Sequence, residues 1–158
     1  MDKLNNKWRL WYHSINDTNW DKTSYNNIYD IDNLFDYRFI IDKFNQLHYQ
    51  NGMFFLMRDN IFPNWEDPDN RNGGCLSFKV SSDKIVNEWN NLFLKCVTDN
   101  ILKNNHNEIN GISISPKKEF NIIKLWFKNH SFNYEDVFYE NDNSFILLKD
   151  SLFKKHSF

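Results

Sequence analysis

Strand-like segments that come in pairs are the feature that most constrains the fold. Residues 111–115 and 120–127 are apolar runs of strand length, and a turn at Pro116, Lys117 and Lys118 separates them. Other strand-like runs occupy residues 7–13, 53–58, 75–80 and 145–148. Helical patterns are inserted singly and do not alternate regularly with the strands, which favours an antiparallel sheet. The chain is therefore expected to be α+β.

Two segments carry the spacing of amphipathic helices. The first runs from about residue 30 to 47, with apolar residues at three-and-four spacing and Asp30 as the expected N-cap. The second begins at Ser82 or Asp83 and has a broad apolar face that includes Trp89. We expect these helices to cover one face of the sheet, which leaves the opposite face free to carry a site.

Length, charge and cysteine usage exclude several classes of protein. At 158 residues the chain is expected to form one domain over residues 1–158, and its net charge of −2 excludes a polycation that coats nucleic acid. It has neither a signal peptide nor the roughly 20-residue apolar run of a membrane span, so a soluble, cytoplasmic protein with no membrane partner is expected. Cys75 and Cys96 stand alone and should be reduced, and the five histidines show no metal spacing. No metal or cofactor is expected.

Tryptophan is the informative part of the composition. The chain has no alanine and is rich in Asn, Lys, Ile and Phe, which is typical of an AT-rich genome such as that of a protist or a large DNA virus. That bias should deplete tryptophan, yet six remain. Trp20 lies in the turn-rich segment 13–27, and Trp65 with Glu66 opens the loop 65–74. Because irregular backbone lies at the surface, these residues are candidates for binding. Core packing of each tryptophan and a solvated Glu66 are the alternatives.

Two tryptophans and a neighbouring carboxylate match what is needed to bind a guanine methylated on N7. The methyl group makes the ring cationic, so indoles stacked on its two faces gain cation–π energy as well as stacking. One carboxylate can accept hydrogen bonds from both N1–H and the N2 amino group. Attached phosphates would need cations, and Lys124 is available on a strand face that it shares with Ile122 and Trp126. Lys117 and Lys118 are also available, although on their own they are better explained as a solvated hairpin turn.

Several motifs together resemble the cap-binding translation initiation factor 4E family over about residues 8 to 127. They are WRLWY at 8–12, the isolated Trp20, YDIDNLF at 29–35, IFPNWEDPDNRNGG at 61–74, Trp89, and GISIS at 111–115 followed by Trp126. The resemblance implies a curved antiparallel β-sheet backed on one face by two or three helices, with a cap-binding slot on the opposite face. It also implies a divergent member that binds the 7-methylguanosine cap of messenger RNA to recruit it for translation initiation.

The resemblance assigns roles to four residues around the base. The guanine would lie between Trp20 and Trp65, Glu66 would read its edge, and Trp126 would contact the methyl group. All four are present in this chain. Their presence argues against a chain that has lost cap binding.

The phosphate side departs from the family pattern. Lys117 stands where an arginine is usual, Ile122 where a lysine is common, and Cys75 where an arginine follows the paired glycines. A rearranged phosphate site is therefore expected. Its candidate cations are Lys117, Lys118 and Lys124, with Arg71 in addition.

The resemblance also implies a surface for a scaffold protein of the initiation factor 4G type, bound through a docked helix. The matching positions are Ile31 and Phe35 on the first helix and Leu94 on the second, near Asn90 and Thr98. Phe35 replaces the usual tryptophan and Asn90 an apolar residue, so a dedicated partner is an alternative. Ile31 and Phe35 could instead complete the core. The chain is expected to be a monomer on its own.

Other functions and the C-terminal segment leave further alternatives. A cap-binding repressor or decoy would bind the cap without recruiting a scaffold. Asp21, Glu66 and Asp67 could form the acid pair of an aromatic-cleft hydrolase, but no catalytic motif accompanies them, so an enzyme is not expected. The segment after Trp126 is shorter than in the family, with a reduced third helix expected around residues 134–139. Lys149, Lys154 and Lys155 are candidates for contacting RNA beyond the cap.

Overall fold

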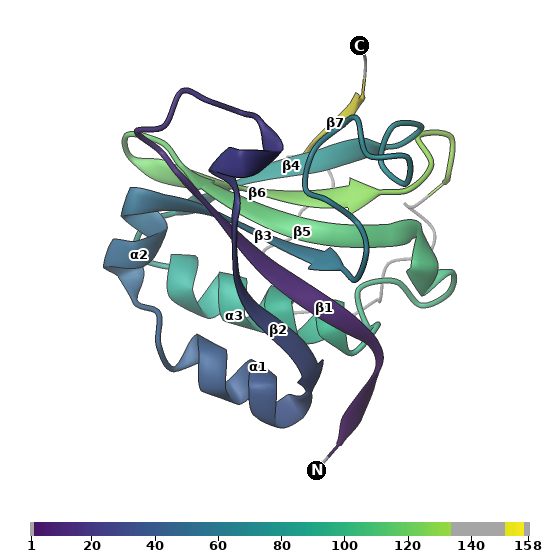
Figure 1. The fold of residues 1–158 in the computed structure, drawn as a ribbon, viewed down its shortest axis with the longest axis horizontal. Coiled ribbons are helices and arrows are strands. Elements are labelled where there is room, and N and C mark those ends of the chain that lie inside the picture. The colour runs from purple at the N-terminus through teal and green to yellow at the C-terminus, as the bar shows by residue number, and fades with distance from the viewer. Residues whose placement is uncertain (1, 134–150, 157–158) are drawn as a thin grey trace.

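The computed structural model describes residues 2–133 and 151–156, and its frame is one antiparallel sheet (Figure 1). Within these residues the sheet has seven strands in the order β2-β1-β3-β5-β6-β4-β7. The strands are β1 (Lys3–Ser14), β2 (Asn26–Asn33), β3 (Gly52–Arg58), β4 (Gly74–Ser81), β5 (Ile109–Pro116), β6 (Phe120–Phe127) and β7 (Leu152–Lys155). Every neighbouring pair is antiparallel, which confirms the prediction from the sequence.

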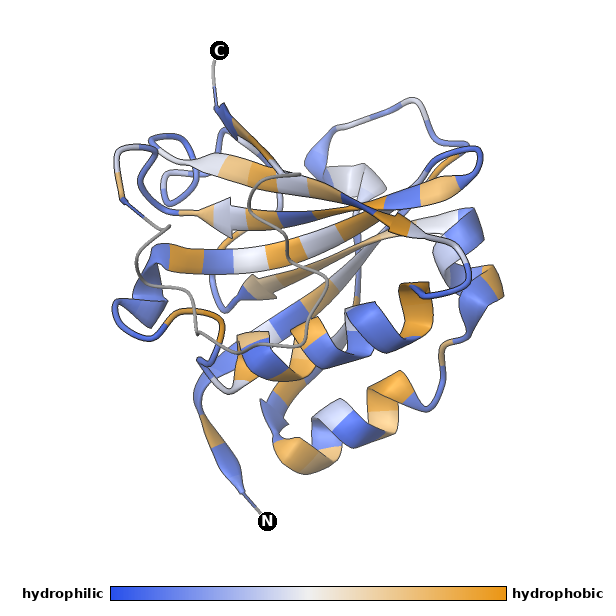
Figure 2. Ribbon diagram, turned by 180° about the vertical axis from the view of Figure 1, so that it is seen from behind, coloured by the Kyte–Doolittle hydropathy of each residue, from blue (hydrophilic) through white to orange (hydrophobic). Residues whose placement is uncertain are grey.

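Helices cover one face of this sheet. Within the described residues they are α1 (Leu34–Ile41), α2 (Gln46–Asn51) and α3 (Ile85–Val97), and two 3₁₀ turns, η1 (Lys22–Ser24) and η2 (His106–Glu108), lie in loops. Figure 2 views the molecule from behind and shows α1 and α3 in front of the sheet. The expected α+β layering is therefore confirmed, and the other face of the sheet is bordered by loops.

Alternation along the strands divides the apolar side chains between two clusters. The larger cluster lies between the sheet and the helices and includes Trp8 and Leu10. The smaller cluster, on the opposite face, includes Phe55 and Trp126, with Trp11 packed against it. The side chains of Trp8 and Leu10 thus leave β1 on one side and that of Trp11 on the other, as expected when successive residues of a strand point to opposite faces. Burial of a large apolar side chain contributes about 1.5–3 kcal/mol.

The predicted helix from about residue 30 to 47 is wrong in its first part. Residues up to Asn33 belong to β2, which pairs with β1, and α1 begins only at Leu34. Asn33 is the N-cap, and its side chain accepts a hydrogen bond from the Asp36 backbone N–H at 2.9 Å. Asp30, the predicted cap, instead pairs with Arg9 at 3.2 Å. Pairing with β1 therefore outweighs the helical spacing before Leu34. The helix also ends earlier than predicted, at Ile41, and α2 is a separate helix.

The predictions for the rest of the chain have mixed outcomes. The strands at 53–58, 75–80, 111–115 and 120–127 are confirmed, and α3 begins two to three residues after the predicted start. The predicted helix at 134–139 and strand at 145–148 lie outside the described residues. Strand β7 was not predicted, because four residues of mixed polarity carry too short a pattern to identify.

The described residues contain no helix long and apolar enough to span a membrane. Cys75 and Cys96 are both free and buried. In the same part of the chain, no three His, Cys, Asp or Glu side chains come together as a metal site would require.

Candidate functional site

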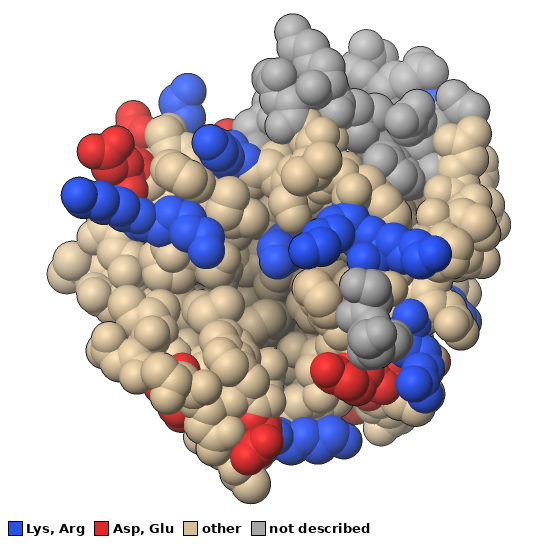
Figure 3. Space-filling view, turned by 90° about the horizontal axis from the view of Figure 1, so that it is seen from above, with Lys and Arg blue, Asp and Glu red and all other residues tan. Residues whose placement is uncertain are grey.

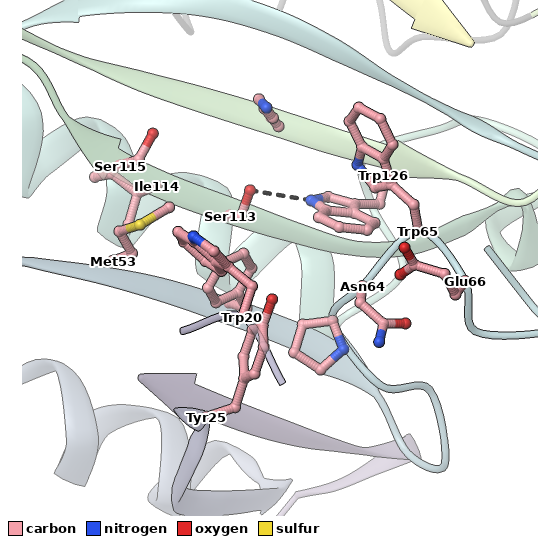
Figure 4. Close-up of a pocket in the computed structure, with 13 residues that line it drawn as sticks. Trp20, Tyr25, Met53, Asn64, Trp65, Glu66, Ser113, Ile114, Ser115 and Trp126 are labelled. Carbon is pink, nitrogen blue, oxygen red and sulfur yellow. Dashed lines mark hydrogen bonds between the residues drawn. The ribbon is translucent and has the colours of Figure 1, made fainter. Parts of the chain in front are cut away.

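A cavity of about 320 Å³ opens on the sheet face opposite the helices. Its lining includes all four residues predicted to contact the base, namely Trp20, Trp65, Glu66 and Trp126, together with Lys124. Figure 4 shows Trp20 on one side and Trp65 with Trp126 on the other, with Glu66 beside Trp65. Three separate parts of the chain therefore meet here: the loop after β1, the loop between β3 and β4, and strand β6.

The segment 13–25, called here the Trp20 wall, positions its indole by contacts among its own residues, and its Tyr25 ring packs against Phe55 and Phe62. His13, at the end of β1, stacks on the Trp20 indole with 3.8 Å between ring centroids and 4° between ring planes. The buried imidazole has its Nδ1 2.8 Å from the Ser14 carbonyl oxygen and its Nε2 2.9 Å from that of Asn19. Nε2 also lies 3.1 Å from Ser24 Oγ. Trp20 itself is 51% exposed, so its position depends on this local stack.

The loop 61–73, together with His156 behind it, is called here the Trp65 wall. The Asp67 carboxylate accepts a hydrogen bond from the Phe62 backbone N–H at 2.9 Å. The buried Asn70 side chain donates to the Phe62 and Asn64 carbonyl oxygens at 3.0 and 2.9 Å. These bonds close the loop around Trp65. The Asp and Asn of the sequence motif are therefore explained by loop geometry.

Two contacts fix this loop to the sheet. Asn110 at the start of β5 donates to Asn70 Oδ1 at 2.9 Å and to the Asp69 carbonyl oxygen at 2.7 Å. Gly73 lies against the end of β6, where an added Cβ would overlap the carbonyl oxygen of Phe127. Only glycine allows so close an approach of two backbone segments, which explains why the first of the paired glycines is a glycine.

A histidine that no local motif singles out lies behind Trp65. His156 follows β7 directly, and its imidazole stacks on the Trp65 indole with 5.1 Å between ring centroids and 17° between ring planes. It is 4% exposed and also meets the edge of Trp126, with ring centroids 5.5 Å apart. Its hydrogen-bond partners, Asn70 and Cys75, are 86 and 81 residues away along the chain. No local pattern in the sequence could have identified it.

Aromatic side chains form the floor of the cavity, and the hydroxyl group of Tyr25 is neutral. Trp126 is buried and donates its indole N–H to Ser113 Oγ at 3.0 Å, as Figure 4 shows. Burial and, to a lesser degree, the negative charge of Glu66 raise the pKa of Tyr25 to about 12. Glu66 is itself exposed and therefore presents an accessible carboxylate at the rim.

The cations around the cavity are only partly those that were predicted. Lys124 lines it, whereas Lys117 and Lys118 lie in the exposed β5–β6 turn outside the lining. Lys154 pairs with Cys75 across β7 and β4, and its Nζ is 5.7 Å from the centroid of the Trp65 ring. Figure 3 shows Lys and Arg side chains gathered along one side of a hollow on this face. Arg71, in the Trp65 wall, does not line the cavity.

The predicted partner surface needs one correction. Ile31 is completely buried in β2, opposite Trp8, and belongs to the core. The expectation that it is exposed on the first helix is wrong, because that helix begins three residues later. Phe35 on α1 and Leu94 on α3 are 59% and 37% exposed.

The fold is shared with solved structures of cap-binding proteins. Ascaris suum eIF4E-3, solved in complex with the m7G cap, matches 82% of this chain and 75% of its own with a TM-score of 0.73 and 19% identity. At this identity the likeness establishes the fold. The family model for eukaryotic initiation factor 4E matches residues 3–149. The chain belongs to the eukaryotic initiation factor 4E family.

Relatives in sequence include translation initiation factors 4E of two fungi. The Eremothecium gossypii protein is 30% identical over 136 residues, which cover 80% of this chain and 62% of that protein. The Candida albicans protein is 26% identical over 138 residues, which cover 80% and 64% respectively. The chain thus spans less than two thirds of the length of these relatives.

Proposed function

We propose that the cavity binds the 7-methylguanosine cap of messenger RNA, with the base stacked between Trp20 and Trp65. One observation carries this proposal: two indoles from distant loops stand on opposite sides of one cavity (Figure 4). A histidine packs on one face of each indole, and neither histidine lines the cavity. The remaining indole faces are available to a flat ligand. The m7G cap bound by the Ascaris protein of the same fold is such a ligand.

Stacking physics explains why the methylated base would be preferred. A base stacked on an aromatic side chain gains about 1–3 kcal/mol. A cationic ring adds about 0.5–2 kcal/mol of cation–π energy at each indole, and an unmethylated guanine lacks this gain. Two indoles therefore distinguish the methylated guanine by charge as well as by shape.

The remaining lining residues supply the contacts that stacking cannot. The Glu66 carboxylate would accept hydrogen bonds from N1–H and the N2 amino group of guanine, which selects this base. Trp126, with its N–H already donated to Ser113, presents only apolar ring surface to the methyl group. Lys124, which lines the cavity, and Lys154, whose Nζ lies 5.7 Å from the centroid of the Trp65 ring, would meet the phosphates in preference to Lys117 and Lys118.

The decisive experiment is a titration of intrinsic tryptophan fluorescence with 7-methyl-GTP and with GTP. The methylated nucleotide should quench emission strongly at low concentration, whereas GTP should bind at least about tenfold more weakly because it lacks the ring charge. ATP serves as the control for non-specific phosphate binding. Equal responses to 7-methyl-GTP and GTP, or no response to either, would contradict the proposal.

In the cell, residues 1–158 would act as one cap-binding domain that recruits messenger RNA for translation initiation in the cytoplasm. The exposed Phe35 and Leu94 support a docked helix of a 4G-type scaffold on the helical face. A scaffold-derived helical peptide should bind the wild-type chain and fail to bind Phe35→Asp. If the peptide binds neither protein while 7-methyl-GTP still binds, a 4G-type scaffold is excluded, and a repressor, a decoy or a protein with a dedicated partner is left.

A further inference from the structure

The imidazole of His156 is the feature that the proposed function leaves unexplained. It is almost completely buried and stacks behind Trp65, although it belongs to a segment far away in the sequence. Its backbone N–H donates to the Gly73 carbonyl oxygen at 3.0 Å, next to the pairing of β7 with β4. The C-terminal strand therefore brings one ring directly behind the indole.

Hydrogen bonds fix the orientation of this ring. Nδ1 lies 2.7 Å from the Asn70 carbonyl oxygen, which can only accept, so Nδ1 carries a proton. Nε2 lies 3.3 Å from Cys75 Sγ. Burial raises the pKa of the Cys75 thiol to about 12, so the S–H remains and donates to Nε2. Burial also lowers the pKa of His156, which is consistent with a neutral ring held between these two partners.

The ring also contacts both indoles on this side of the cavity. Its face meets Trp65, and it makes a T-shaped contact with Trp126 at 60° between ring planes. The carbonyl oxygen of Asn70 accepts the hydrogen bond from Nδ1, and the side chain of the same residue closes the loop around Trp65. One imidazole thus connects the stacking indole, the methyl-sensing indole and the loop.

We propose that His156 is a positioning residue of the cap site, which holds the Trp65 indole in its stacking orientation before the ligand arrives. This inference rests on the proposed function. Trp65 is only half-buried, and without the ring behind it the indole would keep fewer contacts to hold its orientation before the ligand binds. Ordering one such side chain on binding weakens affinity by roughly three- to tenfold. Because the imidazole is neutral, it does not compete with a cationic base for cation–π attraction to the Trp65 indole.

The test compares His156→Leu with His156→Phe. Leucine fills the space without a ring, and phenylalanine keeps a ring without the hydrogen bonds. We expect 7-methyl-GTP to bind His156→Leu roughly three- to tenfold more weakly than wild type and His156→Phe to recover most of the loss. His130→Leu, which changes an exposed histidine outside the cavity lining, is the matched control and should bind like wild type. Equal affinities of the Leu and Phe variants would overturn the proposal.

A second readout follows Trp65 in the free protein. Near-ultraviolet circular dichroism of tryptophan should weaken in His156→Leu and persist in His156→Phe, while the unfolding temperatures of both show that they fold. If wild type fails to bind 7-methyl-GTP, the proposed function falls, but this spectrum still decides whether the ring orders Trp65. If His156→Leu does not fold, the Phe variant decides: loss of binding and of the spectrum in a folded His156→Phe would refute positioning by the ring.

Discussion

The Trp20 wall and the Trp65 wall place equivalent indoles on one cavity, yet they depend on very different amounts of the chain. Hydrogen bonds of the His13 side chain in the Trp20 wall reach at most 11 residues along the sequence. Contacts of His156 in the Trp65 wall bridge 81 and 86 residues and join the loop to β4 and β7. The hydrogen bonds that support the Trp20 indole are therefore local, whereas those that support the Trp65 indole join its loop to two strands of the sheet. The cavity combines a locally supported side with a sheet-anchored side.

This difference has an energetic consequence. Trp20 is half-exposed and packs mainly on residues of its own segment, so changes there should leave the fold intact. Trp65 packs against the smaller cluster on the sheet face, which includes Phe55, Cys75 and Trp126. Changes in the Trp65 wall should therefore reduce both ligand affinity and the free energy of unfolding.

The largest expected effect comes from Gly73→Ala in the Trp65 wall. The new Cβ would overlap the Phe127 carbonyl oxygen, and backbone cannot move aside as a side chain does. We expect a loss of about 2–4 kcal/mol in the free energy of unfolding, measured in urea, together with weaker binding of 7-methyl-GTP.

Gly52→Ala is the matched comparison on the side of the Trp20 wall. Gly52 pairs with Ser14, and its added Cβ would meet the ring of the half-buried Tyr12, which can shift. A loss of about 1 kcal/mol or less is expected there. If both variants lose the same stability, the distinction between a sheet-anchored and a local wall is wrong.

The next effect separates binding from stability within the pair of indoles. Trp20→Ala and Trp65→Ala should each weaken 7-methyl-GTP binding by about 2–4 kcal/mol, because each removes one stacking and cation–π contact. Trp65→Ala should also destabilise the fold by about 2 kcal/mol, whereas Trp20→Ala should change it by less than about 1 kcal/mol. Isothermal calorimetry and urea unfolding measure the two quantities independently. Equal destabilisation by the two variants would contradict the comparison.

The same difference explains which parts could be predicted from sequence. Trp20, Trp65 and Glu66 were found because tryptophans in polar loops are local signals, and Trp126 was found through the resemblance to the initiation factor 4E family. Ile31 was misplaced because helical spacing beyond Asn33 concealed a strand whose pairing with β1 is not a local property.

The supporting residues of the site were harder to predict than its contact residues. His156 and Lys154 acquire their places through the register of β7 on β4, and that register is set by residues about 80 positions away. Period-two geometry did place Lys124 correctly beside Trp126, because both lie on one strand. Sequence alone therefore predicted five residues of the cavity lining, and the packing behind them required the fold.

The smallest expected effect is a pH dependence that belongs to the Trp65 wall. Burial holds the pKa of His156 below its ordinary value of 6.5. Just below pH 6.5 the imidazole is therefore still neutral in the folded protein but already protonated in the unfolded chain. The stability contribution is then fully present above about pH 6.5 and is lost as the pH falls from there through the lower folded pKa, with a slope of at most about 1.4 kcal/mol per pH unit. Lys124 and Glu66 also face this ring, and their charges lower and raise the pKa of His156 respectively.

Urea unfolding at pH 7.5 and pH 5.5 tests this dependence. The free energy of unfolding should fall less between these pH values in His156→Phe than in wild type, because the other histidines contribute equally to both proteins. An identical loss in the two proteins would show that His156 is not held neutral by the fold.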